Sequence, residues 1–199
     1  GEHEDPIKRL DDGYGTDLSE FDTDCLKGVE RLEIGKYCFK KAIQLVIDGL
    51  NELKSIIIGI DSFSYDNRKG SKCVIMNCDQ LNEINIGAKS FHCYESLKLK
   101  NLPSLISIQL DKDAFEWCHR IVFESINDWG NDEWDLIRLQ SITLGKWALL
   151  GDYDTVESNE LKMKSMNDIY DWLMRSPFSI SIQRKRLQLR IHKQSAYRW

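Results

Sequence analysis

Long apolar runs, paired cysteine motifs and a high proline content are all missing from this sequence. No stretch approaches the roughly eighteen consecutive apolar residues that a membrane-spanning helix needs, so no membrane span is expected. The six cysteines form no C-x-x-C pair and the four histidines are scattered, which gives no support for a metal site. Only 3 prolines and 12 glycines occur, which argues against a fibrous or linker protein.

Motifs that would indicate an enzyme are missing as well. The sequence contains no G-x-S-x-G, H-E-x-x-H or G-x-G-x-x-G pattern. A phosphate-binding loop ending at Lys146 is excluded, because Gln140 replaces its first glycine and Trp147 replaces its serine or threonine. Cys118 and His119 are adjacent, but neighbouring strand residues point to opposite sides, so they would make a poor nucleophile pair. We therefore expect no catalytic activity, no cofactor and no metal.

Charge is distributed unevenly, although the net charge is only -5. Residues 1–24 contain nine acids and two bases, which predicts an acidic N-terminal segment or cap. Residues 175–199 contain seven bases and no acid, which predicts a basic C-terminal cap or tail. A nucleic-acid contact through this basic end is disfavoured, because no aromatic stacking pattern accompanies the charges. The cysteine usage favours a cytoplasmic setting; a cell-surface or secreted protein whose N-terminal signal was removed is the alternative.

The positive signal is an internal repeat with a basic unit of 24 residues. The pattern L-x-L-x-x-L-x-x-L-x-x-I-x-L runs from Leu97 to Leu110, and near copies begin at Leu45, Cys73 and Leu161. The last aliphatic residue recurs at spacings of 24, 28, 24 and 34, and the extra residues fall in one place per unit, as loops tolerate. These last aliphatic residues are Ile34, Ile58, Ile86, Leu110 and Leu144.

Each unit predicts two short strands and an inward-facing aromatic residue. The two L-x-L elements have a period of two, so alternate residues should face a shared core. Glycine follows the last aliphatic residue in four units, where we expect it to permit a tight turn with positive φ. Cys73 and Cys78 occupy leucine places and are expected to be buried small hydrophobes. Five residues after the last aliphatic stand the expected space-filling side chains Phe39, Phe63, Phe91, Phe115 and Leu149.

These units resemble the leucine-rich-repeat family. Segments beginning at Leu53, Leu81 and Leu105 are similar to its strand-forming consensus L-x-x-L-x-L-x-x-N-x-L, with Phe in the last leucine place. The I-G-x-x-S-F form is closest to irregular bacterial-surface-antigen-like repeats, which are also common in protists. The resemblance covers about residues 21–174. It implies a right-handed, mainly β repeat solenoid of five to six units over residues 25–174, with few or no long helices and a non-catalytic recognition surface.

One departure from the consensus affects the expected shape. The usual asparagine is replaced, so its buried hydrogen-bond ladder should be missing or partial. A flattened solenoid with strands on two sides is therefore expected instead of a tightly curved horseshoe. A right-handed parallel β-helix or an irregular β-sandwich remains an alternative. The replacing residues are Tyr37, Asp61, Lys89 and Asp113.

A binding face is predicted on the outward side of the second strand of each unit. Its middle residues should form a column, with neighbouring strands about 4.8 Å apart, and its uncharged centre suits a protein or peptide better than a phosphate backbone. These candidate partner-binding residues are Glu33, Ile57, Asn85, Gln109 and Thr143. Trp129 and Trp134, in an acidic insertion, are further candidates; the alternative is that their rings cover an edge of the solenoid.

The sequence thus predicts a protein-interaction module whose partner is a protein or peptide of unknown identity. The alternative function is a structural or assembly component that stacks through the ends of its solenoid.

Overall fold

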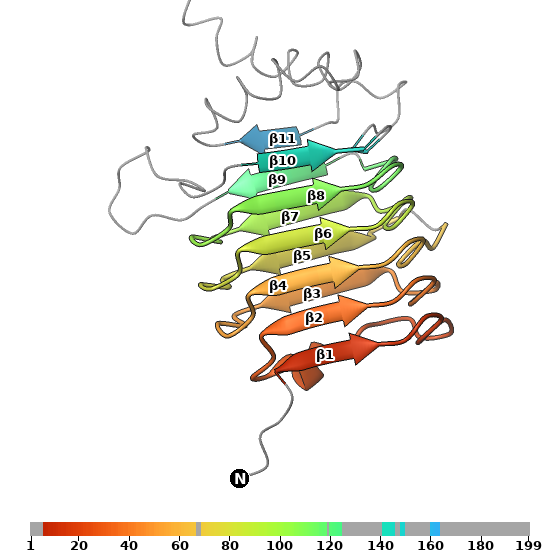
Figure 1. Ribbon diagram of the computed structural model, residues 1–199. Helices are drawn as coiled ribbons and strands as arrows, with labels where there is room; N and C mark the ends of the chain where they lie inside the picture. The colour runs from red at the N-terminus through yellow and green to blue at the C-terminus, as the bar shows by residue number, and fades with distance from the viewer. Residues whose placement is uncertain are drawn as a thin grey trace, which may run out of the picture.

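The computed structural model places eleven strands in two sheets, and the strands within each sheet run parallel to one another (Figure 1). It describes residues 6–66, 69–118, 120–124, 141–145, 148–149 and 160–163. Sheet A contains, in spatial order, β1 (Ile7–Leu10), β2 (Arg31–Ile34), β4 (Ser55–Ile58), β6 (Glu83–Ile86), β8 (Ser107–Leu110) and β10 (Ser141–Leu144). Sheet B contains β3 (Gln44–Asp48), β5 (Lys72–Met76), β7 (Ser96–Lys100), β9 (Arg120–Glu124) and β11 (Glu160–Met163).

The chain alternates between the two sheets, so most turns add one strand to each. Within a sheet the strands of successive turns pair in parallel, and equivalent repeat residues face one another, as Leu32 does Ile56. The one helix among the described residues is the short 3-10 helix η1 (Thr23–Leu26). The predicted mainly β repeat solenoid with strands on two sides is therefore confirmed. No helix in the described part of the chain is long and apolar enough to cross a membrane.

The strand β1 lies inside residues 1–24, the segment predicted as an acidic segment or cap. It pairs with β2 in the same register that joins the later strands, with Leu10 opposite Ile34. The repeat therefore begins before the predicted boundary at residue 25. Its sequence signal is weak, because only Leu10 of this strand is buried. The predicted C-terminal segment, residues 175–199, lies outside the described residues.

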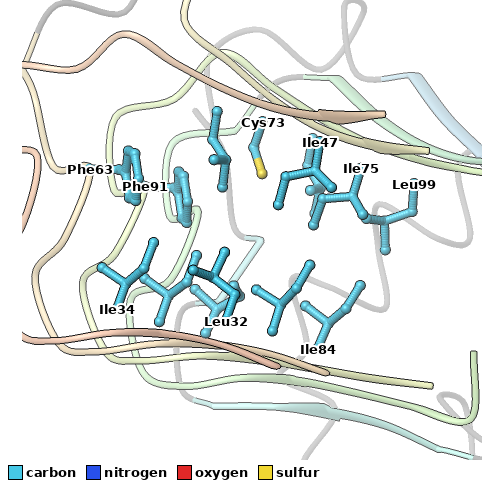
Figure 2. Packing of buried hydrophobic residues seen from close by; sticks show 14 of the residues in the cluster. Leu32, Ile34, Ile47, Phe63, Cys73, Ile75, Ile84, Phe91 and Leu99 are labelled. Atoms are coloured by element: carbon cyan, nitrogen blue, oxygen red, sulfur yellow. The ribbon is translucent and has the colours of Figure 1, made fainter. Parts of the chain in front are cut away.

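The core is an aliphatic layer between the sheets, flanked at one side by an aromatic stack (Figure 2). Strand residues alternate between buried and partly exposed, as Leu32 and Ile34 in β2 illustrate. Successive rings in the series Phe39, Phe63, Phe91 and Phe115 stack with centroids 5.0, 4.8 and 4.7 Å apart. Cys73 and Cys78 are fully buried in the same core, so the predictions of inward aromatics and buried cysteines are confirmed.

The glycines that follow the sheet A strands do not have the predicted positive φ, so that part of the sequence interpretation is wrong. They are needed because adjacent turns approach closely: a Cβ built on Gly59 would lie 2.6 Å from the carbonyl carbon of Gly35. Positive φ belongs instead to residues further along the turn, including Asp61 at 55° and Phe63 at 52°. The turns after β2, β4 and β6 therefore each combine a close backbone contact at the glycine with two left-handed residues.

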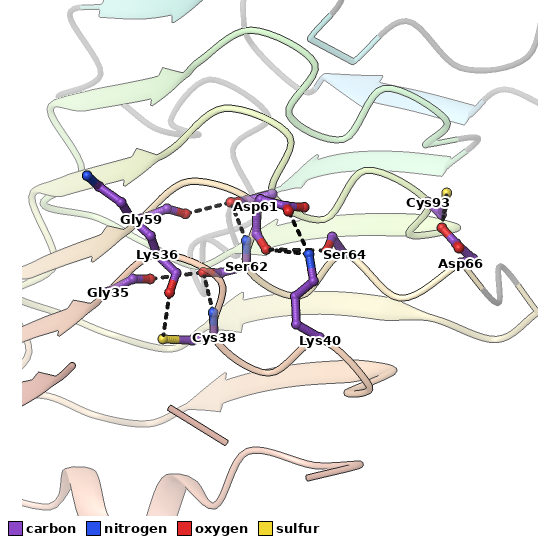
Figure 3. A network of polar contacts seen from close by, with 11 residues as sticks. Gly35, Lys36, Cys38, Lys40, Gly59, Asp61, Ser62, Ser64, Asp66 and Cys93 are labelled. Atoms are coloured by element: carbon purple, nitrogen blue, oxygen red, sulfur yellow. Dashed lines mark hydrogen bonds and ion pairs between the residues drawn. The ribbon is translucent and has the colours of Figure 1, made fainter. Parts of the chain in front are cut away.

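Two serine hydroxyls join these turns where the consensus would place an asparagine ladder (Figure 3). The Ser62 Oγ accepts a hydrogen bond from the Cys38 backbone N–H at 3.0 Å and donates to the Gly35 carbonyl at 2.9 Å. The Ser90 Oγ accepts from the Ser62 N–H at 3.1 Å and donates to the Gly59 carbonyl at 2.7 Å. Each hydroxyl satisfies buried backbone groups of an adjacent turn and so fixes the spacing of the solenoid.

Asparagines do form a short ladder, but at the opposite turn, after the sheet B strands. The Asn101 side chain donates to Asn77 Oδ1 at 3.0 Å, and the Asn77 side chain donates to Asp48 Oδ1 at 2.7 Å. Both asparagines have a positive φ, near 51° and 55°. Asn tolerates this left-handed conformation better than most residues, which explains its recurrence at this turn.

Candidate interaction face

The predicted column of outward residues exists as one register row on sheet A. Each residue of the row is the register partner of the corresponding residue on the adjacent strand, and all of them are partly or fully exposed. Arg9 of β1 extends the row by one strand. The row contains Arg9, Glu33, Ile57, Asn85, Gln109 and Thr143. Its geometry was predicted correctly, and binding by these residues stays a prediction.

An ion-pair cluster occupies the N-terminal part of this face. The Glu33 carboxylate accepts hydrogen bonds from Arg31 Nε at 2.5 Å and from Arg9 Nε at 2.8 Å. The pKa of Glu33 is lowered below its ordinary value, first by the Arg31 hydrogen bond and then by Arg9. This part of the face is therefore charged at neutral pH and already internally paired.

The centre of the face combines an apolar side chain with a hydroxyl that has no partner. Ile57 is half-buried although it points away from the core. Ser55, two residues earlier on the same strand, is only 6% exposed, and its Oγ is a buried side-chain oxygen without a hydrogen-bond partner in the described part of the protein. Its register neighbours are Arg31 and Glu83, whose side chains are partly buried. An unpaired buried hydroxyl is energetically unfavourable, so Ser55 is an exception to the satisfied polar groups of the fold.

Side-chain amides occupy the next part of the row. The Asn85 amide donates to the Glu83 carboxylate two residues earlier, and the Gln109 amide donates to Asp111 Oδ1 at 2.9 Å. These carboxylates hold each amide in one orientation. Thr143 is exposed at the far strand, β10. The face is therefore polar and pre-ordered on both sides of Ile57.

The outer side of sheet B differs in both charge and composition. Its middle row places Val46 opposite Val74 and Val74 opposite Lys98, and all three are partly buried. Lys72 and Arg120 are exposed in the row beside it. Sheet B therefore carries a mixed apolar and basic row on its outer side, and it provides a matched surface for control substitutions.

Charged side chains also join adjacent turns in ion pairs, which the repeat motif alone did not predict. In four of the pairs in the described structure the partners lie 24 residues apart, which is one basic repeat. A search for opposite charges at that spacing would have found them in the sequence. They are Arg9–Glu33, Lys41–Asp17, Lys54–Glu30 and His92–Glu116.

The remaining candidates have different outcomes. Trp129 and Trp134 lie outside the described residues, so their predicted role stays untested. Cys118 is buried and its Sγ lies 3.6 Å from the Glu95 carbonyl, which favours a structural thiol. His119 also lies outside the described residues.

Among the described residues, no group of three or more His, Cys, Asp or Glu side chains could hold a metal ion. Comparisons of the chain with protein-family models, with curated proteins and with solved structures gave no match. The resemblance to leucine-rich repeats therefore rests on the repeat pattern and stays a prediction.

Proposed function

We propose that this chain is a non-enzymatic protein-interaction module that binds its partner through the outer face of sheet A. The observation that carries the proposal is the centre of that face, where half-buried Ile57 lies beside the unpartnered Ser55 hydroxyl. An apolar centre within a polar rim is the usual anatomy of a protein interface. The rigid parallel turns support it, because a pre-ordered face loses little conformational entropy on binding.

The charges around this centre favour a protein partner over a nucleic acid. Arg9 and Arg31 are already paired with Glu33, and Glu83 adds a further carboxylate beside Ser55. Such a mixed surface does not offer the run of free cations that a phosphate backbone requires. A polypeptide segment suits it, with an apolar side chain over Ile57 and polar groups facing the charged and amide side chains around it.

Substitution of Ile57 by aspartate is expected to abolish partner capture. A charged group at the centre of the face would remove the apolar contact and repel Glu33 and Glu83. The expected loss is about 2 kcal/mol or more, which is a weakening of roughly 30-fold. Affinity capture from native lysate with mass spectrometry would identify the partner. Titration of the purified partner would then measure the affinity.

The matched control is Val74→Asp, which places the same charge at an equivalent half-buried position on sheet B. This variant should retain wild-type affinity and should show the same circular dichroism as Ile57→Asp. Equal loss of binding in both variants would argue against sheet A as the interface. Unchanged binding by a folded Ile57→Asp would do so too.

End-to-end assembly is the second candidate function, and exposed apolar side chains at the N-terminal end favour it. Tyr14 and Leu18 are 49% and 48% exposed, whereas Cys38 and Ala42, which occupy the same positions one repeat later, are fully buried. No described strand pairs with the outer edge of β1. An open strand edge beside exposed apolar groups is a common route to association between copies.

Leu18→Glu is expected to remove such assembly. Sedimentation velocity of the wild-type chain over a concentration series would show growing species if ends stack, and this variant should sediment as a monomer. Ile106→Glu is the control, because Ile106 is a similarly exposed residue (39%) between Asn101 and β8, away from the N-terminal end. A wild-type chain that stays monomeric at every concentration would contradict this function.

A further inference from the structure

One cysteine of the chain lies in a hydrogen-bonded series with a histidine and a carboxylate. The Cys93 Sγ is 3.2 Å from His92 Nδ1, and His92 Nε2 is 2.7 Å from Glu116 Oε2. The Glu116 side chain is 19% exposed and that of His92 is 31% exposed. Because a carboxylate can only accept, Nε2 carries its proton, and in the neutral imidazole Nδ1 is then the atom that can accept the thiol proton.

Cys93 differs from the structural cysteines of the solenoid. Cys38, Cys73, Cys78 and Cys118 all belong to the hydrophobic core, and burial raises the pKa of the first three thiols. Cys93 is 6% exposed but lies outside that core cluster. Cys93 follows Phe91 by two residues, as Tyr65 follows Phe63 in the preceding turn. Tyr65 is exposed, so this position faces outward, and at Cys93 neighbouring residues cover it.

The turn holds the histidine in place from several directions. The phenylalanine before it, Phe91, and Tyr94 after it are both buried in the core. The Trp117 ring lies edge-on to the imidazole with centroids 6.3 Å apart, and the backbone N–H of Trp117 donates to the His92 carbonyl at 3.0 Å. A thiol, a base within reach and a third group that orients the base are the arrangement that activates a nucleophile.

The surroundings of the thiol restrict what it could react with. The Cys93 thiol has a second and longer hydrogen-bond acceptor, the Oδ1 of Asp66 at 3.9 Å (Figure 3), and the Glu116 carboxylate is bonded to the other nitrogen of the imidazole, Nε2. Two carboxylates disfavour an anionic reagent, and 6% exposure disfavours a large one. A small neutral electrophile is the reagent that fits, and hydrogen peroxide is such a molecule.

We propose that Cys93 is a peroxide-reactive thiol, with His92 as its base and Glu116 as the residue that positions the base. His92 Nδ1 takes the thiol proton, and the thiolate sulfur attacks one peroxide oxygen. An S–O bond forms as the O–O bond breaks, and the departing hydroxide takes the proton from the imidazolium to become water. Cysteine is oxidised to sulfenic acid, Cys93–SOH, and the peroxide is reduced. The step is stoichiometric and does not depend on the proposed interaction function.

The test compares two cysteines of the same chain. The protein is treated with hydrogen peroxide for a series of times, and the peroxide is then removed with catalase. The chain is next unfolded in urea that contains dimedone, which traps sulfenic acids wherever they formed, and the labelled peptides are quantified by mass spectrometry. Cys25 is exposed and serves as the internal reference. Cys93 is expected to label about tenfold faster than Cys25 at neutral pH, since a positioned base accelerates the thiol. When the chain is already unfolded in urea during the peroxide treatment, Cys93 and Cys25 should be oxidised at similar rates. Labelling of Cys93 no faster than Cys25 in the native chain would overturn the proposal.

Two variants then separate the roles of the partners. His92→Gln should slow labelling of Cys93 about tenfold and leave Cys25 unchanged. Glu116→Gln should change the pH dependence of Cys93 labelling, because it alters the group that holds the imidazole. A purely structural role of Glu116 would lower the rate without moving the pH profile, and that result would remove it from the proposal. A wild-type rate in a folded His92→Gln would overturn the assignment of the base.

Discussion

Replacing Phe91 by alanine is expected to lower the free energy of unfolding by about 4 kcal/mol, the range found for buried Phe→Ala changes. Phe91 is fully buried and contacts three aromatic rings. Its centroid lies 4.8 Å from Phe63, 4.7 Å from Phe115 and 4.9 Å from Tyr94. The stack is continuous across turns, so the cavity would remove contacts on both sides of the ring. Urea denaturation followed by circular dichroism would measure the change.

The backbone conformation makes this substitution easy to interpret. Phe91 has a φ of 53°, in the left-handed region. Alanine keeps the Cβ and hence the same backbone strain, so the measured difference reports the lost ring. Phe91→Leu is the matched control, because Leu149 fills the same place in a later turn at a φ of 55°. It should cost about 1.5 kcal/mol, since the swap retains most of the volume. If Phe91→Ala and Phe91→Leu lowered the free energy of unfolding equally, the ring would not be tightly packed in the stack.

The core residues of this fold could be predicted from the sequence, because the alternation of apolar and polar residues fixes which side chains of each strand are buried. A strand period of two placed Leu32, Ile56 and Ile84 in the core without any knowledge of the turns. The repeat spacing then placed equivalent residues opposite one another, as the register confirms. Both inferences need only the period of the pattern and the length of the unit.

The turns could not be read in the same way, because their chemistry depends on how closely one turn approaches the next. The close contact at Gly59 involves the backbone of Gly35, 24 residues earlier, and no local pattern reports that distance. Ser62 is likewise explained only by the carbonyl and N–H groups that the neighbouring turn presents. The strand β1 was missed because three of its four residues are not buried, so the alternation that marks later strands is weak there.

The candidate interaction face was likewise predicted only in part from the sequence. The alternation of apolar residues predicted which side of β4 faces away from the core, and therefore that Ile57 points outward. It gave no indication that Ser55, on the same side, would be buried without a partner. The residues opposite Ser55 on the adjacent strands are Arg31 and Glu83, and long side chains such as these can cover a small residue between them.

Gly59→Ala is expected to lower the free energy of unfolding by about 3 kcal/mol, at the upper end of the usual cost of overpacking. A Cβ there would lie 2.6 Å from both the carbonyl carbon and the oxygen of Gly35 and 2.7 Å from the Lys36 nitrogen. All three contacts are backbone atoms, so no side chain can rotate away. The two turns must separate instead, which would lengthen the hydrogen bond from the Gly59 N–H to the Ile34 carbonyl, now 2.8 Å.

Gly49→Ala separates this explanation from the positive-φ explanation that the sequence suggested. Gly49 has a φ of 72° and nothing within 4 Å of an added Cβ, so its alanine variant should cost about 1 kcal/mol from backbone strain alone. Close approach therefore predicts that Gly59→Ala is the more damaging change, whereas a φ requirement predicts the reverse order. Urea denaturation of both variants, with equal m-values as the check on a common unfolded state, would decide between them.

The chain itself indicates how a turn could accommodate a Cβ at this row. Asp111 stands where Gly59, Gly87 and Gly145 stand in other turns, and its N–H bonds to the Ile86 carbonyl at 2.9 Å. The corresponding bonds from the glycines Gly35, Gly59, Gly87 and Gly145 are 2.7 or 2.8 Å, so the bond at Asp111 survives a side chain at the cost of only a small widening. In Gly59→Ala the serine bonds across the same gap, from Ser62 to Gly35 and to Cys38, resist such widening. A cost for Gly59→Ala no greater than that for Gly49→Ala would mean that these bonds yield, and that adjacent turns are not held at a fixed distance.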